Sequence, residues 1–273
     1  MLMINKCKHF VQKVLFLLEN DYLCAKKVLN YYHYYMLYYH LDGSVEAFTA
    51  GRNDALPYPV IQGHQIHEDR IAVIDKEFLD VNPLSEISFT STEVSHHPSL
   101  EGFDAFVTSL PEVAIAVRTA DCVPVLLYDQ RRKVVAAVHS GWRSTVKRIS
   151  QKTLHLMSER FGSEPEDVIA IIGPCICHDS YQVGEEVIED FRKAGFDDCC
   201  WTQDAKPADN KYHLDLWRAN SMLLVEAGVK EENIHLSGIC TFMDENYYSA
   251  RREGNKHDRR NINAIKLLSD SLI

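Results

Sequence analysis

The chain has 273 residues, of which 46% are hydrophobic and 25% charged, an ordinary balance for a globular protein. Its formal net charge of −10 argues against a nucleic-acid surface, because binding to phosphates requires a clustered basic face. The apolar run over residues 14–18 is too short to cross a membrane, and no small-residue cleavage site follows it. Eight cysteines in so long a chain do not form a dense secreted framework, so we expect reduced thiols and a cytoplasmic protein.

The first forty residues differ in composition from the rest of the chain. They are rich in tyrosine, leucine, lysine and histidine, and six tyrosines fall within residues 31–39. We therefore expect an N-terminal extension over residues 1–40, followed by a single domain over residues 41–273.

From residue 45 onward, β-branched apolar runs alternate with amphipathic segments. Strands are expected over residues 45–49, 71–74, 113–117, 123–128, 134–139, 168–172, 234–241, 247–252 and 262–267. Helices are expected over residues 142–161, 184–194 and 214–227, the first and third ended by a glycine. Hairpins mixed with helices indicate an α+β fold, a single layered domain of mixed or antiparallel sheets flanked by helices.

The runs 123–128 and 134–139 are separated by a short polar stretch that predicts an antiparallel hairpin. If Gln130 and Arg131 form the centre of the turn, Cys122 pairs with His139. Directly opposed residues have Cβ atoms roughly 4.5–5.5 Å apart on the same side of the sheet. This separation allows a thiolate and an imidazole to share one metal ion.

The alternative interpretation treats Cys122 as a small buried hydrophobe and His139 as a hydrogen-bonded histidine at a strand end. Polar and special residues over 119–121 and 140–143 gather at the same end of the hairpin, where the apolar runs stop. Functional sites are commonly built in such places, which favours the metal interpretation.

Several motifs occur in order along the chain. They read TADCVPV over residues 119–125, HSGWR over 139–143, IGPCI over 172–176, YQVG over 181–184, CT over 240–241 and YSARR over 248–252. Together they resemble the motifs of the YfiH or laccase-domain family, over residues 63–267. The resemblance implies a YfiH-like fold, with residues 41–273 as the catalytic domain.

The resemblance also implies a third metal ligand, the histidine of a QxH motif, which makes His67 the partner of Cys122 and His139. Glu68 stands where the family motif has glycine. Two histidines and one cysteine leave the fourth tetrahedral position of Zn²⁺ open, as in catalytic zinc sites, and Cu²⁺ is a second candidate. The competing histidines are His64, by proximity, and then His96 and His97 in the loop before the hairpin.

Members of this family are described as purine nucleoside phosphorylases and were earlier named polyphenol oxidases. The resemblance therefore implies zinc-dependent phosphorolysis of adenosine, inosine, guanosine and S-methyl-5'-thioadenosine, with adenosine deaminase activity. Purine nucleosides and phosphate are the expected partners, without nucleic acid or membrane, and the protein is expected to be a monomer or homodimer.

Further residues receive roles from the same motifs. Arg252 corresponds to the C-terminal arginine of the family and would bind phosphate or stabilise negative charge in catalysis. Arg251 is easily confused with it, and on a strand only one of the two would face the site. Asp121 either orients a ligand, acts as an acid or base, or caps a turn.

Two other functional classes remain open. A metal-free cysteine hydrolase would use Cys122 as nucleophile and His139 as base, and would not need His67. A non-catalytic partner-binding protein is also possible, because the segment between residue 49 and the QxH motif is shorter than in the family. The run from Cys175 to His178 suggests a second metal site, but we prefer to interpret Cys175 as part of the IGPxI turn.

Overall fold

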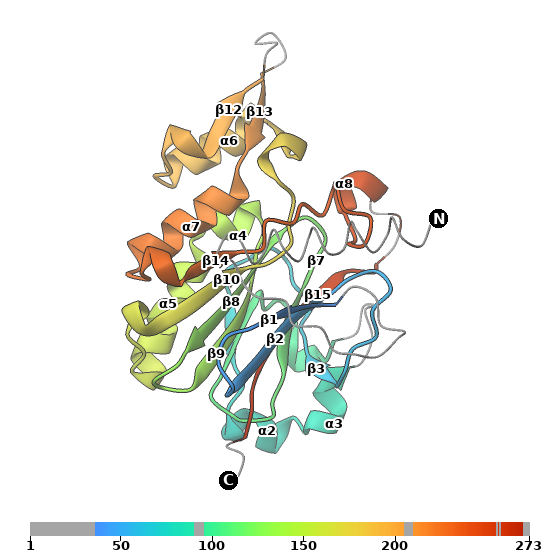
Figure 1. The fold of residues 1–273 in the computed structure, drawn as a ribbon, viewed down its shortest axis with the longest axis vertical. Coiled ribbons are helices and arrows are strands. Elements are labelled where there is room, and N and C mark those ends of the chain that lie inside the picture. The colour runs from blue at the N-terminus through green and yellow to red at the C-terminus, as the bar shows by residue number, and fades with distance from the viewer. Residues whose placement is uncertain (1–35, 90–95, 205–209, 255, 257, 270–273) are drawn as a thin grey trace, which may run out of the picture.

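Two six-stranded sheets lie face to face at the centre of the molecule (Figure 1). This is a computed structural model, and it describes residues 36–89, 96–204, 210–254, 256 and 258–269. The first sheet has the order β1 (Leu37–Tyr39), β2 (Val45–Ala50), β15 (Asn261–Leu267), β7 (Ile115–Thr119), β3 (Val60–Ile61), β5 (Ser88–Phe89). The second sheet has the order β14 (Ile234–Leu236), β10 (Val168–Ile172), β8 (Val123–Asp129), β9 (Val134–Ser140), β6 (Ala105–Thr108), β4 (Ile71–Val73).

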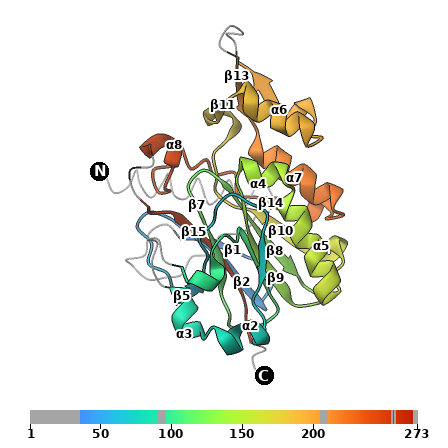
Figure 2. The ribbon, with the colours of Figure 1, turned by 180° about the vertical axis from the view of Figure 1, so that it is seen from behind.

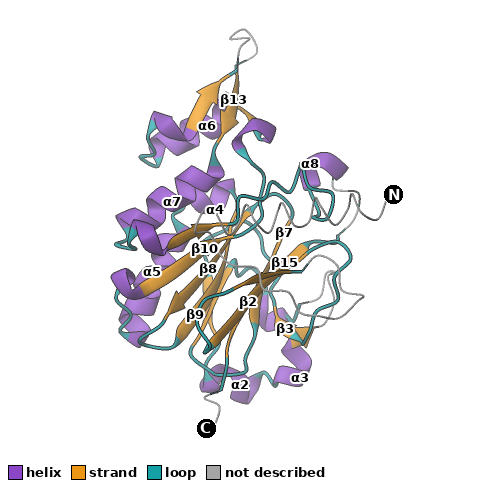
Figure 3. Cartoon of the chain, viewed as in Figure 1, coloured by secondary structure: helices purple, strands orange, loops and turns teal. Residues whose placement is uncertain are grey.

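Both sheets are mixed. Most neighbouring strands are antiparallel, whereas β10 with β14, β4 with β6 and β3 with β7 are parallel. The expected α+β fold, with layered sheets flanked by helices, is confirmed (Figure 3).

The second sheet is buried on both faces. Along β8, Val125 and Leu127 pack toward the helices, while Leu126 and Tyr128 pack toward the first sheet. Strands covered on both sides have near-continuous apolar sequences. This double burial explains why β8 and β9 were visible in the sequence as apolar runs.

Helices cover the outer face of the second sheet. The helices α4 (Trp142–Val146), α5 (Ile149–Phe161) and α7 (Leu216–Glu226) lie along this side (Figures 1 and 3). Helix α6 (Glu185–Lys193) and the small sheet of β11 (Gln182–Gly184), β13 (Lys211–Leu214) and β12 (Trp201–Gln203) extend beyond the sheets as a lobe. The short helices α2 (Lys76–Val81) and α3 (Leu84–Ile87) lie at the opposite end, clearest from behind (Figure 2).

Several predicted boundaries differ from the structure. The helix expected over residues 142–161 is two helices, because Arg148 has a left-handed backbone with φ of 61°. The strand expected over 234–241 ends at Leu236, and Gly238 has a φ of 66°. The strand expected over 247–252 is wrong, since residues 250–253 form helix α8 (Ala250–Glu253), capped by the hydroxyl of Ser249.

The predicted N-terminal extension is only partly within the described residues. Residues 1–35 lie outside them, so the order of that segment stays a prediction. The last part of the expected extension belongs to the first sheet, because Tyr38 of β1 pairs with Phe48 of β2. Within the described ranges, no helix combines the length and apolar character that a bilayer crossing requires.

Candidate metal centre

His139 lies on β9 and faces the first sheet. It alternates in phase with Val135 and Ala137, whose side chains pack into the core between the sheets. Its strand partner is Pro124, so the predicted pairing of Cys122 with His139 is wrong. The turn is longer than predicted, with Asp129 opposite Val134.

The cause of this longer turn is a side chain. The carboxylate of Asp129 accepts hydrogen bonds from the N–H groups of Arg131 at 2.8 Å and Arg132 at 2.9 Å. Lys133 then adopts a left-handed conformation with φ of 52°. The resulting shift moves the register by an even number of positions, so Cys122 and His139 stay on the same face as diagonal neighbours.

Cys122 lies in the connection that crosses from β7 of the first sheet to β8 of the second. The preceding Asp121 has a left-handed backbone with φ of 83°. Its carboxylate accepts hydrogen bonds from the hydroxyl of Thr241 and the backbone N–H of Arg251, both at 2.7 Å. These contacts favour the turn-holding interpretation of Asp121, because one oxygen binds the loop of Thr241 and the other binds the first turn of the helix over residues 250–253.

His67 lies in the connection that crosses from β3 of the first sheet to β4 of the second. The side-chain amide of Gln65 anchors this loop, donating to the carbonyl of Arg118 at 2.9 Å and accepting from its N–H at 2.7 Å. Three successive N–H groups of the loop donate to the fully buried carboxylate of Asp104, at 3.0–3.1 Å, from Ile66, His67 and Glu68.

Asp104 joins the two histidine-bearing segments. Besides the three N–H groups of the His67 loop, it contacts Nδ1 of His139 at 2.7 Å. A carboxylate bound to one imidazole nitrogen fixes the ring orientation and leaves Nε2 available as a ligand. Asp104 stands alone before β6 without a motif or a periodic pattern, so its role was not predicted from the sequence.

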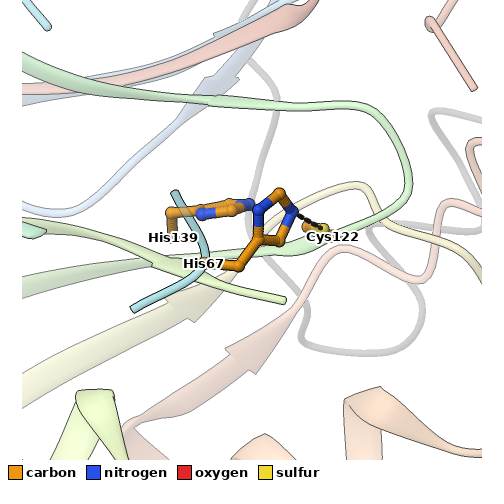
Figure 4. Close-up of side chains that lie close together, drawn as sticks. All are labelled: His67, Cys122 and His139. Carbon is orange, nitrogen blue, oxygen red and sulfur yellow. Dashed lines mark hydrogen bonds between the residues drawn. The ribbon is translucent and has the colours of Figure 1, made fainter. Parts of the chain in front are cut away.

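The three predicted ligands converge (Figure 4). Their ligand atoms all lie within 4.8 Å of one another, and Sγ of Cys122 lies 3.7 Å from Nε2 of His67. The rings of His67 and His139 meet edge to face, with centroids 4.8 Å apart. One sulfur and two imidazole nitrogens at this spacing suit Zn²⁺, so the residues present fit the metal that the motifs imply.

The electrostatics of the cluster favour a thiolate. Burial alone would raise the pKa of Cys122, but the charge and hydrogen bonding of His139 and His67 lower it to about 6. Burial would lower the pKa of His139, whereas the Cys122 charge and the Asp104 hydrogen bond raise it. Because the thiolate is the metal-binding form of cysteine, the cluster holds Cys122 in the reactive state at neutral pH.

Gly141 leaves the space that two ligands occupy. A Cβ at this position would lie 2.9 Å from Sγ of Cys122 and 3.0 Å from Cδ2 of His67. We expect Gly141→Ala to lower zinc affinity by about 10–100-fold, an effect comparable to losing an outer-shell partner. Competition with a chelating dye measures this affinity. The control is Gly43→Ala, where a Cβ meets nothing within 4 Å, and equal affinities of the two variants would contradict the expectation.

The two arginines at the C-terminal motif point to different neighbours. Nη1 of Arg252 donates to the carbonyls of Thr241 at 2.6 Å and Phe242 at 2.9 Å, and Nη2 donates to the carbonyl of Tyr247. The side chain of Arg251 is exposed and lies over the ring of Tyr181, 5.3 Å from its centroid. Both residues belong to helix α8, so they do not alternate between two faces as expected for a strand.

Tyr181 links Arg251 to the metal cluster. Burial and the nearby Cys122 charge raise the pKa of Tyr181, while Arg251 and Arg143 oppose this shift. The charges of Cys122, Arg251 and Arg143 therefore all act on Tyr181, and Arg251 contacts its ring directly. The sequence motif named both Arg251 and Arg252 but assigned the phosphate role to Arg252, whose guanidinium instead binds carbonyls of the 241–247 loop.

The competing candidates lie elsewhere. His64 and His96 gather around Glu101, and His97 accepts a hydrogen bond from the N–H of Ser99 at 3.3 Å. Of the metal-capable groups formed by described residues, none includes a member of the 175–178 run.

Comparisons with known proteins identify the family of the chain. Residues 47–267 match the family described as multi-copper polyphenol oxidoreductase laccase. A purine nucleoside phosphorylase of Bacteroides thetaiotaomicron is 38% identical over 216 residues, 78% of each chain. Adenosine deaminase RL5, from an unknown prokaryotic organism, is 39% identical over 201 residues, 71% of this chain and 70% of that protein.

Solved structures share the fold. The hypothetical protein YfiH of Bacillus licheniformis has a TM-score of 0.71 at 25% identity, covering 85% of this chain and 96% of that one. YlmD of Geobacillus stearothermophilus has a TM-score of 0.73 at 20% identity, covering 89% and 100%. The chain therefore belongs to the YfiH-like family described as multi-copper polyphenol oxidoreductase laccase.

Proposed function

We propose that the protein is a zinc-dependent purine nucleoside phosphorylase that also deaminates adenosine. Its nucleoside substrates would be adenosine, inosine, guanosine and S-methyl-5'-thioadenosine. The observation that carries the proposal is the convergence of His67, Cys122 and His139, with ligand atoms within 4.8 Å of one another. The names of the relatives, a purine nucleoside phosphorylase and an adenosine deaminase, supply the substrate class.

Three residues would bind the metal, and a fourth orients one of them. His67, Cys122 and His139 would hold Zn²⁺, and Asp104 keeps Nδ1 of His139 occupied so that Nε2 faces the cluster. When bound, Zn²⁺ would supply Lewis acidity at a position left open by three protein ligands. Cu²⁺ would fit the same nitrogen and sulfur donors. Elemental analysis of the purified protein identifies which metal is bound.

Phosphate recognition would fall to the guanidinium groups around Tyr181. Charged hydrogen bonds from arginine to phosphate are strong and directional, and Arg251 is exposed beside this ring. We assign the first phosphate contact to Arg251. Arg252, which the motif implies for this role, would shape the loop, because both Nη1 and Nη2 of its guanidinium donate to carbonyls, those of Thr241 and Tyr247. Arg251 donates through Nη1 to the carbonyl of Gln182 at 2.9 Å and is the more exposed of the two.

The reaction would break the bond between the ribose anomeric carbon and the purine nitrogen. A phosphate oxygen forms the new bond to that carbon, and the purine leaves with a proton taken up at the ring nitrogen. The products are a free base and ribose 1-phosphate, or 5-methylthioribose 1-phosphate when the substrate is S-methyl-5'-thioadenosine. In the deamination, water replaces the exocyclic amine of adenosine and ammonia leaves.

A metal-free cysteine hydrolase is the second candidate. The observation that favours it is that Cys122 lies within 4.8 Å of His139, whose Nδ1 contacts Asp104 at 2.7 Å, the set of nucleophile, base and orienting acid found in hydrolases. This mechanism does not use His67. A non-catalytic partner-binding protein is the third class, and it predicts no turnover.

Product analysis tests the proposal. Purified protein carrying one equivalent of zinc is incubated with inosine or, separately, with adenosine, each with and without phosphate. We expect hypoxanthine and ribose 1-phosphate only when phosphate is present, and inosine from adenosine in both conditions. Cys122→Ser, purified in parallel, controls for contaminating phosphorylase. Absence of hypoxanthine from the zinc-loaded protein would overturn the assignment.

A further inference from the structure

A second group of metal-capable side chains lies on the surface, separate from the His67 centre. It contains His64, His96 and Glu101, whose ligand atoms also lie within 4.8 Å of one another. Nδ1 of His64 lies 2.5 Å from one carboxylate oxygen of Glu101, and Nε2 of His96 lies 3.0 Å from the other. The two imidazole rings stack with centroids 4.9 Å apart and planes 22° from parallel.

The backbone fixes two members of this group relative to each other. His64 and Glu101 form a parallel β-bridge, and the N–H of Gly102 donates to the carbonyl of His64 at 2.9 Å. The neighbouring Gln65 anchors the same loop to Arg118. A site that is held by backbone contacts needs little rearrangement to bind an ion, which lowers the cost of ordering its ligands.

The short helix before Glu101 brings His96 back to the group. Residues Pro98–Leu100 form a 3₁₀ turn, in which the N–H of Leu100 donates to the carbonyl of His97 at 2.9 Å and that of Glu101 donates to Pro98 at 3.2 Å. His96 and Glu101 are five positions apart in sequence and approach through this turn. The group is therefore built from two backbone segments, each tied by its own hydrogen bonds.

Each imidazole turns one nitrogen toward the Glu101 carboxylate, and without a metal these contacts are hydrogen bonds. In the other tautomer of a neutral imidazole the same nitrogen carries a lone pair instead of a proton. The two nitrogens and the carboxylate can therefore exchange their hydrogen bonds for bonds to one divalent ion placed between them.

We propose that His64, His96 and Glu101 bind a second divalent transition-metal ion. The donor set of two imidazoles and one carboxylate suits Zn²⁺, Co²⁺, Ni²⁺ and Cu²⁺, whereas Ca²⁺ and Mg²⁺ prefer oxygen ligands alone. The side chains of His64, His96 and Glu101 are 47%, 28% and 53% exposed. The ion is therefore bound more weakly and exchanges faster than one held by the thiolate centre.

Zinc titration of the full-length chain, free of any purification tag, tests this site. Binding is followed by competition with a chelating dye. The wild type is expected to bind one tight and one weaker equivalent of zinc. The double variant His64→Ala/His96→Ala is expected to lose only the weaker equivalent, and His67→Ala/Cys122→Ser only the tight one. Glu101→Gln is expected to raise the dissociation constant of the weaker equivalent by at least about tenfold, the lower bound for losing an outer-shell partner.

The matched control is another surface histidine beside a glutamate. His155 lies 3.2 Å from Glu159, and both side chains are exposed, but no third ligand makes a metal-capable group with them in the described part of the chain. His155→Ala is expected to keep both equivalents. The proposal is overturned if the His64/His96 double variant binds the same number of zinc ions as the wild type and His155→Ala.

Cobalt substitution separates the two centres without an activity readout. A thiolate ligand gives Co²⁺ an intense charge-transfer absorption, which a site made of imidazoles and a carboxylate lacks. The second equivalent of Co²⁺ should therefore add no charge-transfer band, and the band should survive in His64→Ala/His96→Ala. A charge-transfer band that grows in proportion through both equivalents would place the second ion on a cysteine and contradict the proposal.

Discussion

His67→Ala should abolish tight zinc binding and, with it, phosphorolysis of inosine. The variant removes one of three ligands whose atoms lie within 4.8 Å of one another, leaving only Cys122 and His139. Losing an outer-shell partner already costs about 10–100-fold in metal affinity, so loss of a direct ligand should exceed a hundredfold. Elemental analysis after dialysis against a chelator gives the zinc content, and initial rates give the activity.

This variant also separates the metal enzyme from the cysteine hydrolase. Ile66→Ala is the matched control, because Ile66 belongs to the same loop, is 45% exposed, and contributes to Asp104 only through its backbone N–H. The control should keep zinc and activity. Full activity of zinc-free His67→Ala would support the dyad of Cys122 and His139 and remove the metal from the mechanism.

The second large effect is expected at Asp104. Asp104→Ala would leave one imidazole nitrogen and three backbone N–H groups without their buried acceptor. Removing one partner of a buried charged network costs about 3–5 kcal/mol, so the free energy of unfolding should fall by this amount. Urea denaturation of the metal-free protein measures the loss, which is expected to exceed that of any other single carboxylate tested.

The control for Asp104 is the partly exposed carboxylate of Asp75, which lies 3.6 Å from the guanidinium of Arg160 on the surface. Asp75 caps helix α2 by accepting one hydrogen bond from the N–H of Phe78 at 2.9 Å. Asp75→Ala should cost about 1 kcal/mol, the usual effect of losing an N-cap. If both variants lose the same free energy of unfolding, Asp104 does not stabilise the contact between the His67 loop and His139 as the structure indicates.

The pH dependence of this stabilisation follows from the direction of the shift. Burial alone would raise the pKa of Asp104, but hydrogen bonding and the charge of His139, with N–H groups of Glu68 and Ile66, lower it below 3.8. A carboxyl group whose pKa is lower in the folded state stabilises the fold above its unfolded pKa. The contribution is therefore complete at neutral pH and is lost as the pH falls through the folded pKa.

The strands could be predicted from the sequence, but the register could not. The double burial of β8 and β9 gives long apolar runs, so both were predicted within one residue of their ends. The turn between them depends on the Asp129 carboxylate, which accepts two N–H groups and lengthens the loop. Hydrophobic patterning does not encode that side-chain contact, and the register shifted accordingly.

The candidate site could be predicted in part for a similar reason. A register shift by an even number keeps Cys122 and His139 on one face, so their convergence did not depend on the exact pairing. His67 came only from the resemblance, because no local pattern links it to a residue 55 positions away. Asp104 was missed, since its role exists only once β6 lies beside β9. Residues 250–253 form a helix where a strand was predicted, and the side chains of Arg251 and Arg252 therefore contact different neighbours.

The crossing connections that carry His67 and Cys122 have a consequence for how the protein folds. Each connection starts in one sheet and ends in the other, so the ligands meet only after the two sheets have docked. Contacts between segments so distant in the chain form slowly, because the intervening loops must first be closed. Zinc that binds only this assembled form would stabilise it by about 4 kcal/mol at a thousandfold excess over the dissociation constant. The ion would thus bind late in folding and stabilise the docked sheets. Activity would therefore appear only after folding is complete.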